Sequence, residues 1–197
     1  MIINMMQENL KILQCFDNKY VDAKILPLSQ KHLEEIELSW KPLLKNNNYW
    51  DKDLDFSKYL QENPHLKFYA LECNLVTQGI ICLHPNCPSR LESGKKLVYV
   101  NILTVAPWNR VDIQSSQQYK GIGTNLITFA VIFSMNLGFE GRIGLHSVKQ
   151  AVGFYKKLYF IDLGHDINEN NFQYLELSPD DSELLVLNSL LVCNLNN

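Results

Sequence analysis

The chain has 197 residues, of which 46% are hydrophobic and 20% are charged, and its formal net charge is −3. These values predict a globular domain with a substantial core, and with no Lys/Arg run longer than two residues they argue against a dedicated nucleic-acid-binding protein. No apolar run is long enough to span a bilayer, and the start "MIINMMQENLKIL" lacks the basic region and cleavage site of a signal peptide.

Cysteine usage favours a reducing environment. The five cysteines are odd in number and irregularly spaced, so free thiols in the cytoplasm are the expected state. The group Cys82, His84 and Cys87 has no second ligand pair at zinc-like spacing, and Pro85 and Pro88 are typical of an ordinary loop. We therefore expect no metal site.

The first half of the chain begins with helical patterns and then changes to strands. Residues 1–19 have a weak helical period, and a strand is expected over 20–26. Ser29 can cap a helix that runs to about residue 44, and a short helix is expected over 53–61. Two apolar runs, 66–73 and 76–84, are separated by a polar turn and predict a hairpin. A longer strand follows over 96–106.

The second half alternates strands and helices. The run 125–137 is apolar almost all round, which predicts a buried helix that ends at Gly138. Strands are expected over 142–147, 159–164 and 172–177. Ser147 and Gln150 suggest a capping box for a helix over 148–158, and Ser178 precedes a final helix over about 179–193. This order predicts one α+β domain over residues 1–197, with a largely antiparallel twisted sheet and helices on both faces.

A glycine turn separates the long strand from the buried helix. In "QYKGIGTN", Gly121 and Gly123 permit close backbone approach, and the amides at a helix start suit a pyrophosphate. The Walker pattern is absent, and Leu126 replaces the third glycine of the dinucleotide fingerprint. Taken alone, the turn is equally consistent with a plain strand-to-helix connection.

The wider pattern "ILTVAP…QYKGIGTNLI…RIGLHS…AVGFYKKLYF" resembles the GNAT superfamily of acetyl-coenzyme A-dependent N-acyltransferases. The family's phosphate loop, Gln/Arg-x-x-Gly-x-Gly/Ala, is matched by residues 118–123. Its later Ala-x-x-Phe-Tyr helix, followed by an apolar segment that ends in Phe, is matched by Ala151, Phe154, Tyr155, Leu158 and Phe160. The resemblance covers roughly residues 66–177.

The resemblance implies a site with acetyl-coenzyme A as cofactor. The strand backbone at Leu103, Thr104 and Val105 would pair with the pantetheine arm. The turn would hold the pyrophosphate through Gln118, Tyr119, Lys120, Gly121, Ile122, Gly123 and Thr124. Tyr155 matches the tyrosine that protonates the departing thiolate in many members. A core tyrosine that hydrogen-bonds a carbonyl is the alternative reading.

Several positions depart from the family pattern. Residues 108–117 lengthen the turn after Pro107, at a place where Arg110 would otherwise begin the loop; this insertion is expected to shape the acceptor pocket, act as a lid, or be a surface loop. The preceding strand offers Asn101 and Thr104 where many members carry a glutamate base. Val148 and Tyr159 stand where an asparagine and a glycine are usual.

The missing carboxylate leaves the general base open. His146 is one candidate because it ends a strand on the expected catalytic edge and histidine titrates near neutral pH; Glu72 is a weaker one. Trp40, Trp50 and Trp108 would line the acceptor site or belong to the core.

The predicted function is acetyl transfer to a small-molecule or protein amine, with no nucleic-acid or membrane partner. The alternative is a non-catalytic acyl-coenzyme A-binding or protein-interaction module. A homodimer is left open.

Overall fold

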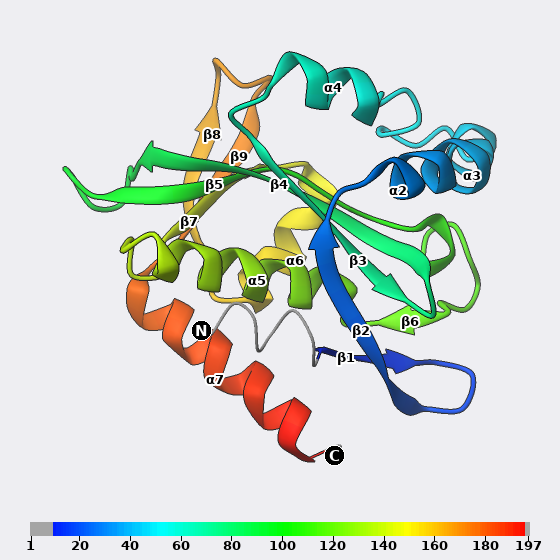
Figure 1. The fold of residues 1–197 in the computed structure, drawn as a ribbon. Coiled ribbons are helices and arrows are strands. Elements are labelled where there is room, and N and C mark those ends of the chain that lie inside the picture. The colour runs from blue at the N-terminus through cyan, green and yellow to red at the C-terminus, as the bar shows by residue number, and fades with distance from the viewer. Residues whose placement is uncertain (1–9, 196–197) are drawn as a thin grey trace. The chain divides into compact units, whose positions relative to one another are not determined.

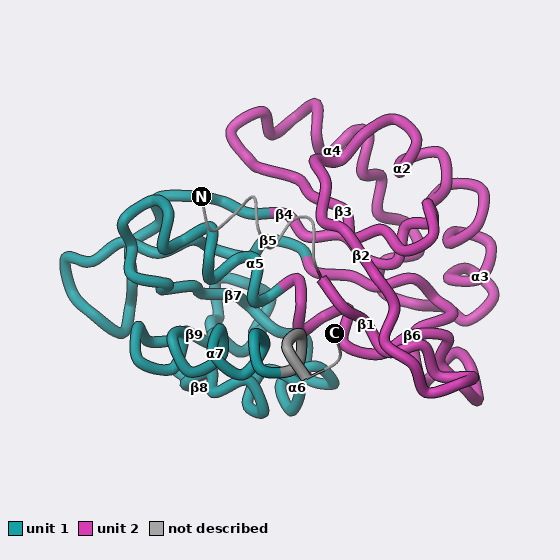
Figure 2. Tube along the Cα trace, turned by 60° about the horizontal axis from the view of Figure 1, so that its bottom comes forward, with its two compact units in different colours: residues 1–3, 83–102, 127–197 teal, residues 4–82, 103–126 magenta. Residues whose placement is uncertain are grey.

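A computed structural model describes the backbone of residues 10–195; residues 1–9 and 196–197 lie outside the described part. The chain divides into two compact units, each assembled from segments distant in sequence (Figure 2). In the described part, unit 1 comprises residues 83–102 and 127–195, and unit 2 comprises residues 10–82 and 103–126. The long elements β4, β5 and α5 contribute residues to both units.

Unit 2 contains the N-terminal strands, the helical segment and the glycine turn. Its strand order is β6-β1-β2-β3-β4 (Figure 1). Its strands are β1 (Leu10–Gln14), β2 (Lys19–Pro27), β3 (Lys67–Cys73), β6 (Tyr119–Lys120) and the first part of β4 (Val76–Pro88). The helical elements are α2 (Gln30–Glu35), a π-helix over Ile36–Trp40, α3 (Lys41–Asn46), α4 (Phe56–Glu62) and a 3₁₀ turn over Pro107–Asn109.

The predicted hairpin and the first long helix are confirmed. β3 and β4 are joined by Asn74 and Leu75, which both adopt positive φ (51° and 64°), as the two central residues of a tight hairpin turn require. The segment from Gln30 to Asn46 is helical throughout, and the Ser29 side chain and the His32 side chain form a capping box at its start. The first strand of the hairpin was expected to begin at residue 66, and β3 begins at Lys67.

Unit 1 contains the second half of the sheet and the C-terminal helices. Its strand order is β4-β5-β7-β9-β8, with β5 and β7 parallel and β7, β9 and β8 antiparallel. The elements are β5 (Lys96–Val105), α5 (Ile122–Asn136), β7 (Ile143–Ser147), a 3₁₀ turn over Lys149–Ala151, α6 (Val152–Lys157), β8 (Ile161–Asp166), β9 (Phe172–Leu177) and α7 (Pro179–Leu195).

Each unit has its own buried apolar cluster. In unit 2 it includes Ile25, Trp40, Leu71 and Ile80, and in unit 1 it includes Leu97, Leu145 and Leu175, all at most 1% exposed. In unit 1, α7 lies beside α5 (Figure 1), where the hydroxyls of Thr128 and Ser189 are 3.0 Å apart. Burial of these apolar faces supplies most of the stabilisation, at about 25 cal/mol per Å² of apolar surface.

Two sequence expectations are corrected. The weak helical period of residues 1–19 does not form a helix in the described part, because residues 10–14 pair with β2 and β6 as strand β1; residues 1–9 lie outside it. The capping box of Ser147 and Gln150 is also absent, because the Ser147 hydroxyl donates to the carbonyl of Val148 and a 3₁₀ turn precedes α6. The Ser178 cap is confirmed: its hydroxyl accepts the Asp181 amide at 3.2 Å.

Candidate functional site

The predicted phosphate turn lies between β6 and α5. Gly121 has φ +88°, a left-handed conformation that side chains rarely adopt, and α5 begins at the next residue. The amide of Asn125 makes a helical hydrogen bond to the carbonyl of Gly121 at 2.9 Å. The amides of Ile122 and Gly123 lie in the first turn of α5, where backbone N–H groups have no acceptor within their own helix. Such amides are suited to bind an anion.

The amides just before the glycines already have protein partners. Gln118 donates its amide to the carbonyl of Trp108 at 3.1 Å, and Tyr119 donates its amide to the side-chain oxygen of Asn109 at 2.9 Å. The pairing of Tyr119 and Lys120 with β1 further fixes this side of the turn. A pyrophosphate would therefore be held by the glycine side of the loop.

A close contact with β4 fixes the start of α5. A Cβ atom at Gly79 would lie 2.7 Å from the Ile122 side chain, 2.9 Å from the Leu126 side chain and 3.3 Å from the carbonyl of Thr104. Only glycine allows the first turn of α5 to come this near the strand. Gly79 was not predicted from the sequence, although a lone glycine within an apolar strand is a recognised signal of close backbone approach.

The expected pantetheine strand alternates in burial. Thr104 is 4% exposed and donates its hydroxyl to Asp51 at 2.6 Å, whereas Leu103 and Val105 are half-buried. The Val105 carbonyl accepts a hydrogen bond from the Arg110 Nε at 2.9 Å. Thr104 therefore has a structural partner, and its hydroxyl belongs to a buried network with Arg110.

Hydrogen bonds hold both ends of the insertion at residues 108–117. Asn109, 3% exposed, donates to the Gln78 side-chain oxygen at 2.9 Å and accepts the amide of Tyr119. Trp108 donates to the same Gln78 oxygen at 2.9 Å, and Gln117 donates to the Asn109 carbonyl at 2.6 Å. These bonds join the two ends of the insertion, so the segment between them is a closed loop attached through its base.

In unit 1, the hydroxyl-bearing ring of Tyr155 lies in an aromatic cluster. Tyr155 is 7% exposed, and its ring makes edge contacts with Phe154 at 5.0 Å and Phe160 at 5.4 Å between centroids. Burial raises the pKa of its phenol well above the ordinary value, so the group is protonated at neutral pH. The expectation that Tyr155 faces inward is confirmed; its catalytic role stays a prediction.

His146, also in unit 1, has partners at both ring nitrogens. Nδ1 lies 2.7 Å from the Tyr99 hydroxyl, and Nε2 lies 3.2 Å from Asp166 Oδ2. The ring also packs on Tyr174, with centroids 4.8 Å apart. His146 was a candidate from the sequence, but its partners Tyr99 and Asp166 were not predicted, because no local pattern links three residues on β5, β7 and β8.

Glu72 belongs to a polar cluster in unit 2. Its carboxylate is paired with Lys31, and His32 Nε2 lies 2.8 Å from its Oε1. His32 Nδ1 accepts the amide of Ser29 at 2.8 Å, so the neutral ring carries its proton on Nε2 and donates it to Glu72. These partners account for the burial of the Glu72 carboxylate, and they do not favour a role for Glu72 as general base.

The three tryptophans differ in their burial. Trp40, 1% exposed, and Trp108 make an edge contact at 6.3 Å within unit 2. Trp50 is 52% exposed. The core interpretation therefore holds for Trp40.

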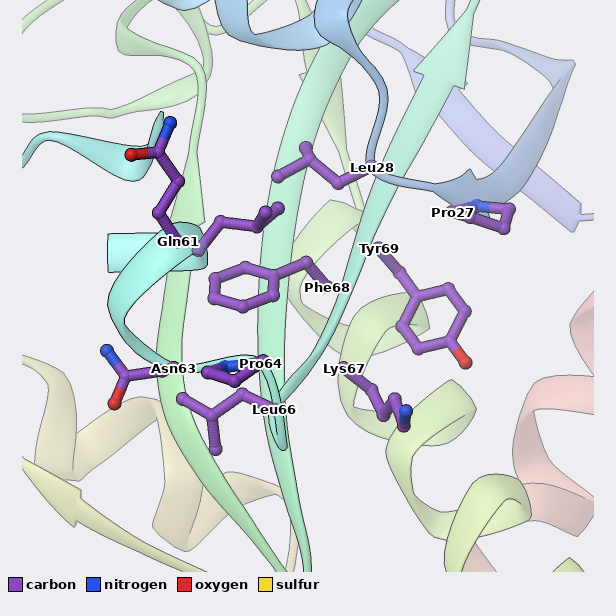
Figure 3. Close-up of a pocket in the computed structure, with 10 residues that line it drawn as sticks. Pro27, Leu28, Gln61, Asn63, Pro64, Leu66, Lys67, Phe68 and Tyr69 are labelled. Atoms are coloured by element: carbon purple, nitrogen blue, oxygen red, sulfur yellow. The ribbon is translucent and has the colours of Figure 1, made fainter. Parts of the chain in front are cut away.

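Unit 2 also contains a pocket of about 520 Å³ beside α4 and the start of β3 (Figure 3). Leu66 and Phe68 face one side of β3 together with Pro64 and Gln61, while Lys67 and Tyr69 point to the other side. The volume is typical of small-ligand pockets. Lys67 is the charged residue among those that line it, so the pocket offers mainly shape and apolar surface.

Among residues 10–195, no three His, Cys, Asp or Glu side chains gather in a way that could hold a metal ion. None of the helices in that part of the chain combines the length and apolar character needed to cross a bilayer. The four cysteines with described side chains are free thiols.

Comparison with solved structures shows that the chain has the fold of the GNAT N-acetyltransferases. No family model matches the sequence, and no curated protein matches it. Solved structures do match. The chain has 19% identity and a TM-score of 0.55 to a structure of a mutant of the AtaT toxin bound to the C-terminus of the antitoxin AtaR and acetyl-CoA, over 83% of this chain and 98% of that one.

Two further structures show the same fold in other settings. The Bacillus subtilis N-acetyltransferase YlbP, in complex with coenzyme A, is 19% identical with a TM-score of 0.53, over 81% of this chain and 97% of that one. Arabidopsis thaliana Naa50, in complex with the bisubstrate analogue CoA-Ac-MVNAL, is 20% identical with a TM-score of 0.51, over 80% and 99% of the two chains. The mixed, largely antiparallel GNAT fold expected from the sequence is thus confirmed.

Proposed function

We propose that this protein is an acetyl-coenzyme A-dependent N-acetyltransferase that acts in the cytoplasm on a primary amine. The observation that carries the proposal is the turn at Gly121–Gly123, which combines a left-handed glycine, the first amides of a long helix and a close backbone approach at Gly79. Amides at the first turn of a helix, next to a glycine that permits close approach, are suited to bind a pyrophosphate. The comparison supports the same reading, because structures with this fold hold coenzyme A or acetyl-CoA.

The bound cofactor would supply an activated acetyl thioester. The chain's contribution would be position and electrostatics. In this proposal Ile122 and Gly123 bind the pyrophosphate with their amides, assisted by the exposed Lys120. Leu103 and Val105, half-buried on one face of β5, present backbone groups to the pantetheine arm. An N–H of that strand would stabilise the oxyanion that forms when the amine attacks.

Tyr155 is the proposed general acid. Its phenol holds a proton at neutral pH because burial raises its pKa, and a phenol in this state can donate to a departing thiolate. Tyr155→Phe removes the hydroxyl and retains the ring that packs on Phe154 and Phe160. We expect turnover to fall about 100-fold with acetyl-coenzyme A affinity unchanged. Unchanged turnover across the pH range would remove Tyr155 from this role.

The first experiment measures cofactor binding by isothermal titration. Acetyl-coenzyme A should bind with a dissociation constant in the micromolar range, as is usual for such cofactors. The matched variant is Gly123→Asp, which places a negative charge beside the predicted pyrophosphate, and we expect it to abolish binding at the concentrations tested. Failure of the unmodified protein to bind at about 1 mM would refute the proposal.

The amine acceptor follows from a broader assay. Release of free coenzyme A should be measured against amino acids, polyamines, aminoglycosides and peptides with a free N-terminus. Cofactor binding without release for any acceptor would favour a non-catalytic acyl-coenzyme A-binding module.

A further inference from the structure

The end of β5 directs its backbone groups alternately to two sides. Ala106, directly after the strand, donates its amide to the carbonyl of Gln78 on β4 at 2.8 Å. Ala106 therefore faces β4, and so does Thr104, two residues earlier. Because successive residues of a strand direct their N–H and C=O groups to opposite sides, those of Leu103 and Val105 face away from β4. Leu103 and Val105 together form the outer edge of β5.

The insertion already bonds to one group of this outer edge. Arg110, 9% exposed, donates its Nε to the Val105 carbonyl at 2.9 Å. This carbonyl is the last one of the outer edge before Pro107, which has no amide proton to continue a ladder. A ligand lying along the outer edge would meet the Leu103 amide, the Leu103 carbonyl and the Val105 amide, whereas the Val105 carbonyl is bonded within the protein.

Several partners hold the Arg110 side chain against Val105, all within unit 2. The two terminal guanidinium nitrogens lie 3.0 and 2.5 Å from the carboxylate oxygens of Asp51, which is 3% exposed. One of them also donates to the Thr104 hydroxyl at 2.6 Å, and the guanidinium lies 4.8 Å over the Tyr49 ring. With all three nitrogens bonded, Arg110 cannot turn away from Val105 without leaving a buried carboxylate unpaired.

We propose that Arg110 is a positioning residue that sets the register of the pantetheine arm on β5, with Asp51 as its support. This inference rests on the proposed acetyltransferase function and deepens it, because it names the backbone groups that the arm would use. The Leu103 carbonyl would accept from an amide of the arm, and the Val105 amide would donate to a carbonyl of the arm. Pairing would end there, since Arg110 takes the next acceptor.

Register is a real choice for a ligand that pairs with a strand. Only alternate residues face the ligand, so the next allowed register is two residues away, a displacement of about 7 Å. The insertion at residues 108–117 lengthens the connection between the outer edge and the glycine turn, so the covalent chain itself no longer holds these two parts close together. Arg110 would supply a fixed point at the end of the strand.

The expected consequence concerns turnover more than affinity. The number of bonds between the strand and the arm is similar in either register, so cofactor affinity should change little when the fixed point is lost. The position of the reacting group does change, and a displacement of even about 1 Å can lower a rate about 100-fold. A residue with a purely structural role would not separate these two quantities.

The first test requires cofactor binding but no catalysis. In carbonyl NMR spectra of the isotope-labelled protein, coenzyme A should shift the Leu103 signal and leave the Val105 signal in place, and it should slow hydrogen exchange of the Val105 amide about tenfold. ADP, which has a pyrophosphate but no arm, should shift the amide signals of Ile122 and Gly123 and leave both strand residues unchanged. A Val105 carbonyl signal that moves as far as that of Leu103, or strand shifts of equal size with ADP, would overturn the inference.

The second test separates kcat from KM in Arg110→Lys. Lysine retains the charge opposite Asp51, but its ammonium lacks the planar fork that bonds to Asp51 and Val105 together. We expect kcat to fall about 100-fold, with KM for acetyl-coenzyme A within about twofold of the unmodified protein. In this variant coenzyme A should also shift the Val105 carbonyl signal, because that acceptor has become available to the arm.

The matched control is Arg142→Lys in unit 1. Arg142 is 6% exposed, pairs with Glu92 and donates to the Phe139 carbonyl at 3.1 Å, so it is also a buried arginine that joins a carboxylate to a backbone carbonyl. Thermal melts should show that both variants lose stability, but Arg142→Lys should retain kcat.

The outcomes separate the two proposals. An Arg110→Lys variant whose kcat equals that of the unmodified protein, or falls no further than that of Arg142→Lys, would refute the positioning role and leave the acetyltransferase function intact. If Arg110→Lys does not fold, the carbonyl signals of the unmodified protein decide the inference by themselves. Failure of the unmodified protein to bind coenzyme A would refute the proposed function, and the inference with it.

Discussion

Arg110 and Asp51 form a buried, two-pronged ion pair within unit 2, although 59 positions separate them in the sequence. The guanidinium nitrogens lie 3.0 and 2.5 Å from the two carboxylate oxygens, and the side chains are 8% and 1% exposed. Arg110 also bonds to Thr104 and to the carbonyl of Val105, and it lies 4.8 Å over the Tyr49 ring. One residue of the insertion therefore connects the proposed pantetheine strand to the segment after α3.

Arg110→Ala is expected to destabilise the protein by about 3–5 kcal/mol, because Asp51 would be left as a buried charge with its main partner removed. Urea unfolding followed by circular dichroism measures the change. The matched control is Lys58→Ala, which breaks an exposed pair with Glu62 (69% and 60% exposed) and should cost less than about 0.5 kcal/mol. The double variant Asp51→Leu/Arg110→Met should recover most of the loss; a double variant as unstable as Arg110→Ala would contradict this account.

Asn109→Ala is expected to weaken acetyl-coenzyme A binding about fivefold. Asn109 holds the Tyr119 amide just before the glycines, and loss of that bond frees the turn at a cost of about 1 kcal/mol. Titration calorimetry measures the affinity. Asn109→Asp retains the acceptor for the Tyr119 amide but loses the donor to Gln78. Its affinity for acetyl-coenzyme A should therefore lie between those of the unmodified protein and Asn109→Ala. Gln117→Ala, which removes a bond to the Asn109 carbonyl only, serves as the control. Equal affinities for all four proteins would show that the base of the insertion does not position the turn.

Gly79→Ala is expected to destabilise the protein, because its methyl group would lie 2.7 Å from Ile122 and 2.9 Å from Leu126. Displacing the first turn of α5 should cost about 1–3 kcal/mol, as overpacking commonly does. The matched control is Gly153→Ala in α6, where a Cβ meets nothing within 4 Å and the helix should gain up to about 1 kcal/mol. Thermal melts of both variants test the difference, and a Gly79→Ala melt equal to that of the unmodified protein would contradict the close contact.

Tyr159→Gly is expected to stabilise the protein. Tyr159 has φ +68° and is 43% exposed. It stands at the position where the GNAT sequence pattern usually has glycine. Glycine relieves the left-handed strain but adds freedom to the unfolded chain, for a net gain of about 0.5–1 kcal/mol. Tyr159→Ala retains the β-carbon and should show no such gain in urea unfolding. A gain of equal size in both variants would point away from the backbone as its source.

The cluster around Glu72 predicts a pH dependence of stability. Burial by itself would raise the pKa of Glu72, but the hydrogen bonds from Lys31 and His32 outweigh it and lower the pKa below the usual value of 4.5. Because the folded pKa is depressed, this contribution is present above the unfolded pKa and is lost as pH falls through the folded pKa. The free energy of unfolding should therefore decline below about pH 4.5, and Glu72→Gln should show a shallower decline. Parallel curves for the two proteins would exclude Glu72 as a contributor.

The chain's local patterns predicted most of its elements. The hairpin at Asn74-Leu75, the buried run of α5 and the Ser178 cap each depend on residues within a few positions of one another. The N-terminal failure has the same physical origin: the weak helical period of residues 10–14 was overridden because that backbone pairs with β2 and β6. Local propensity is a weak guide where strand partners come from distant segments.

By itself, the sequence determined the fold class, the left-handed glycine turn and the inward direction of Tyr155, because periodicity and glycine placement act over short stretches of chain. Tertiary structure alone decided which polar groups meet. Tyr99 and His146 are 47 positions apart, and Lys31 and Glu72 are 41 apart. Such pairs leave no local signal, since a charged or hydroxyl side chain on a helix or strand is expected to face solvent until the fold brings its partner to hydrogen-bonding distance.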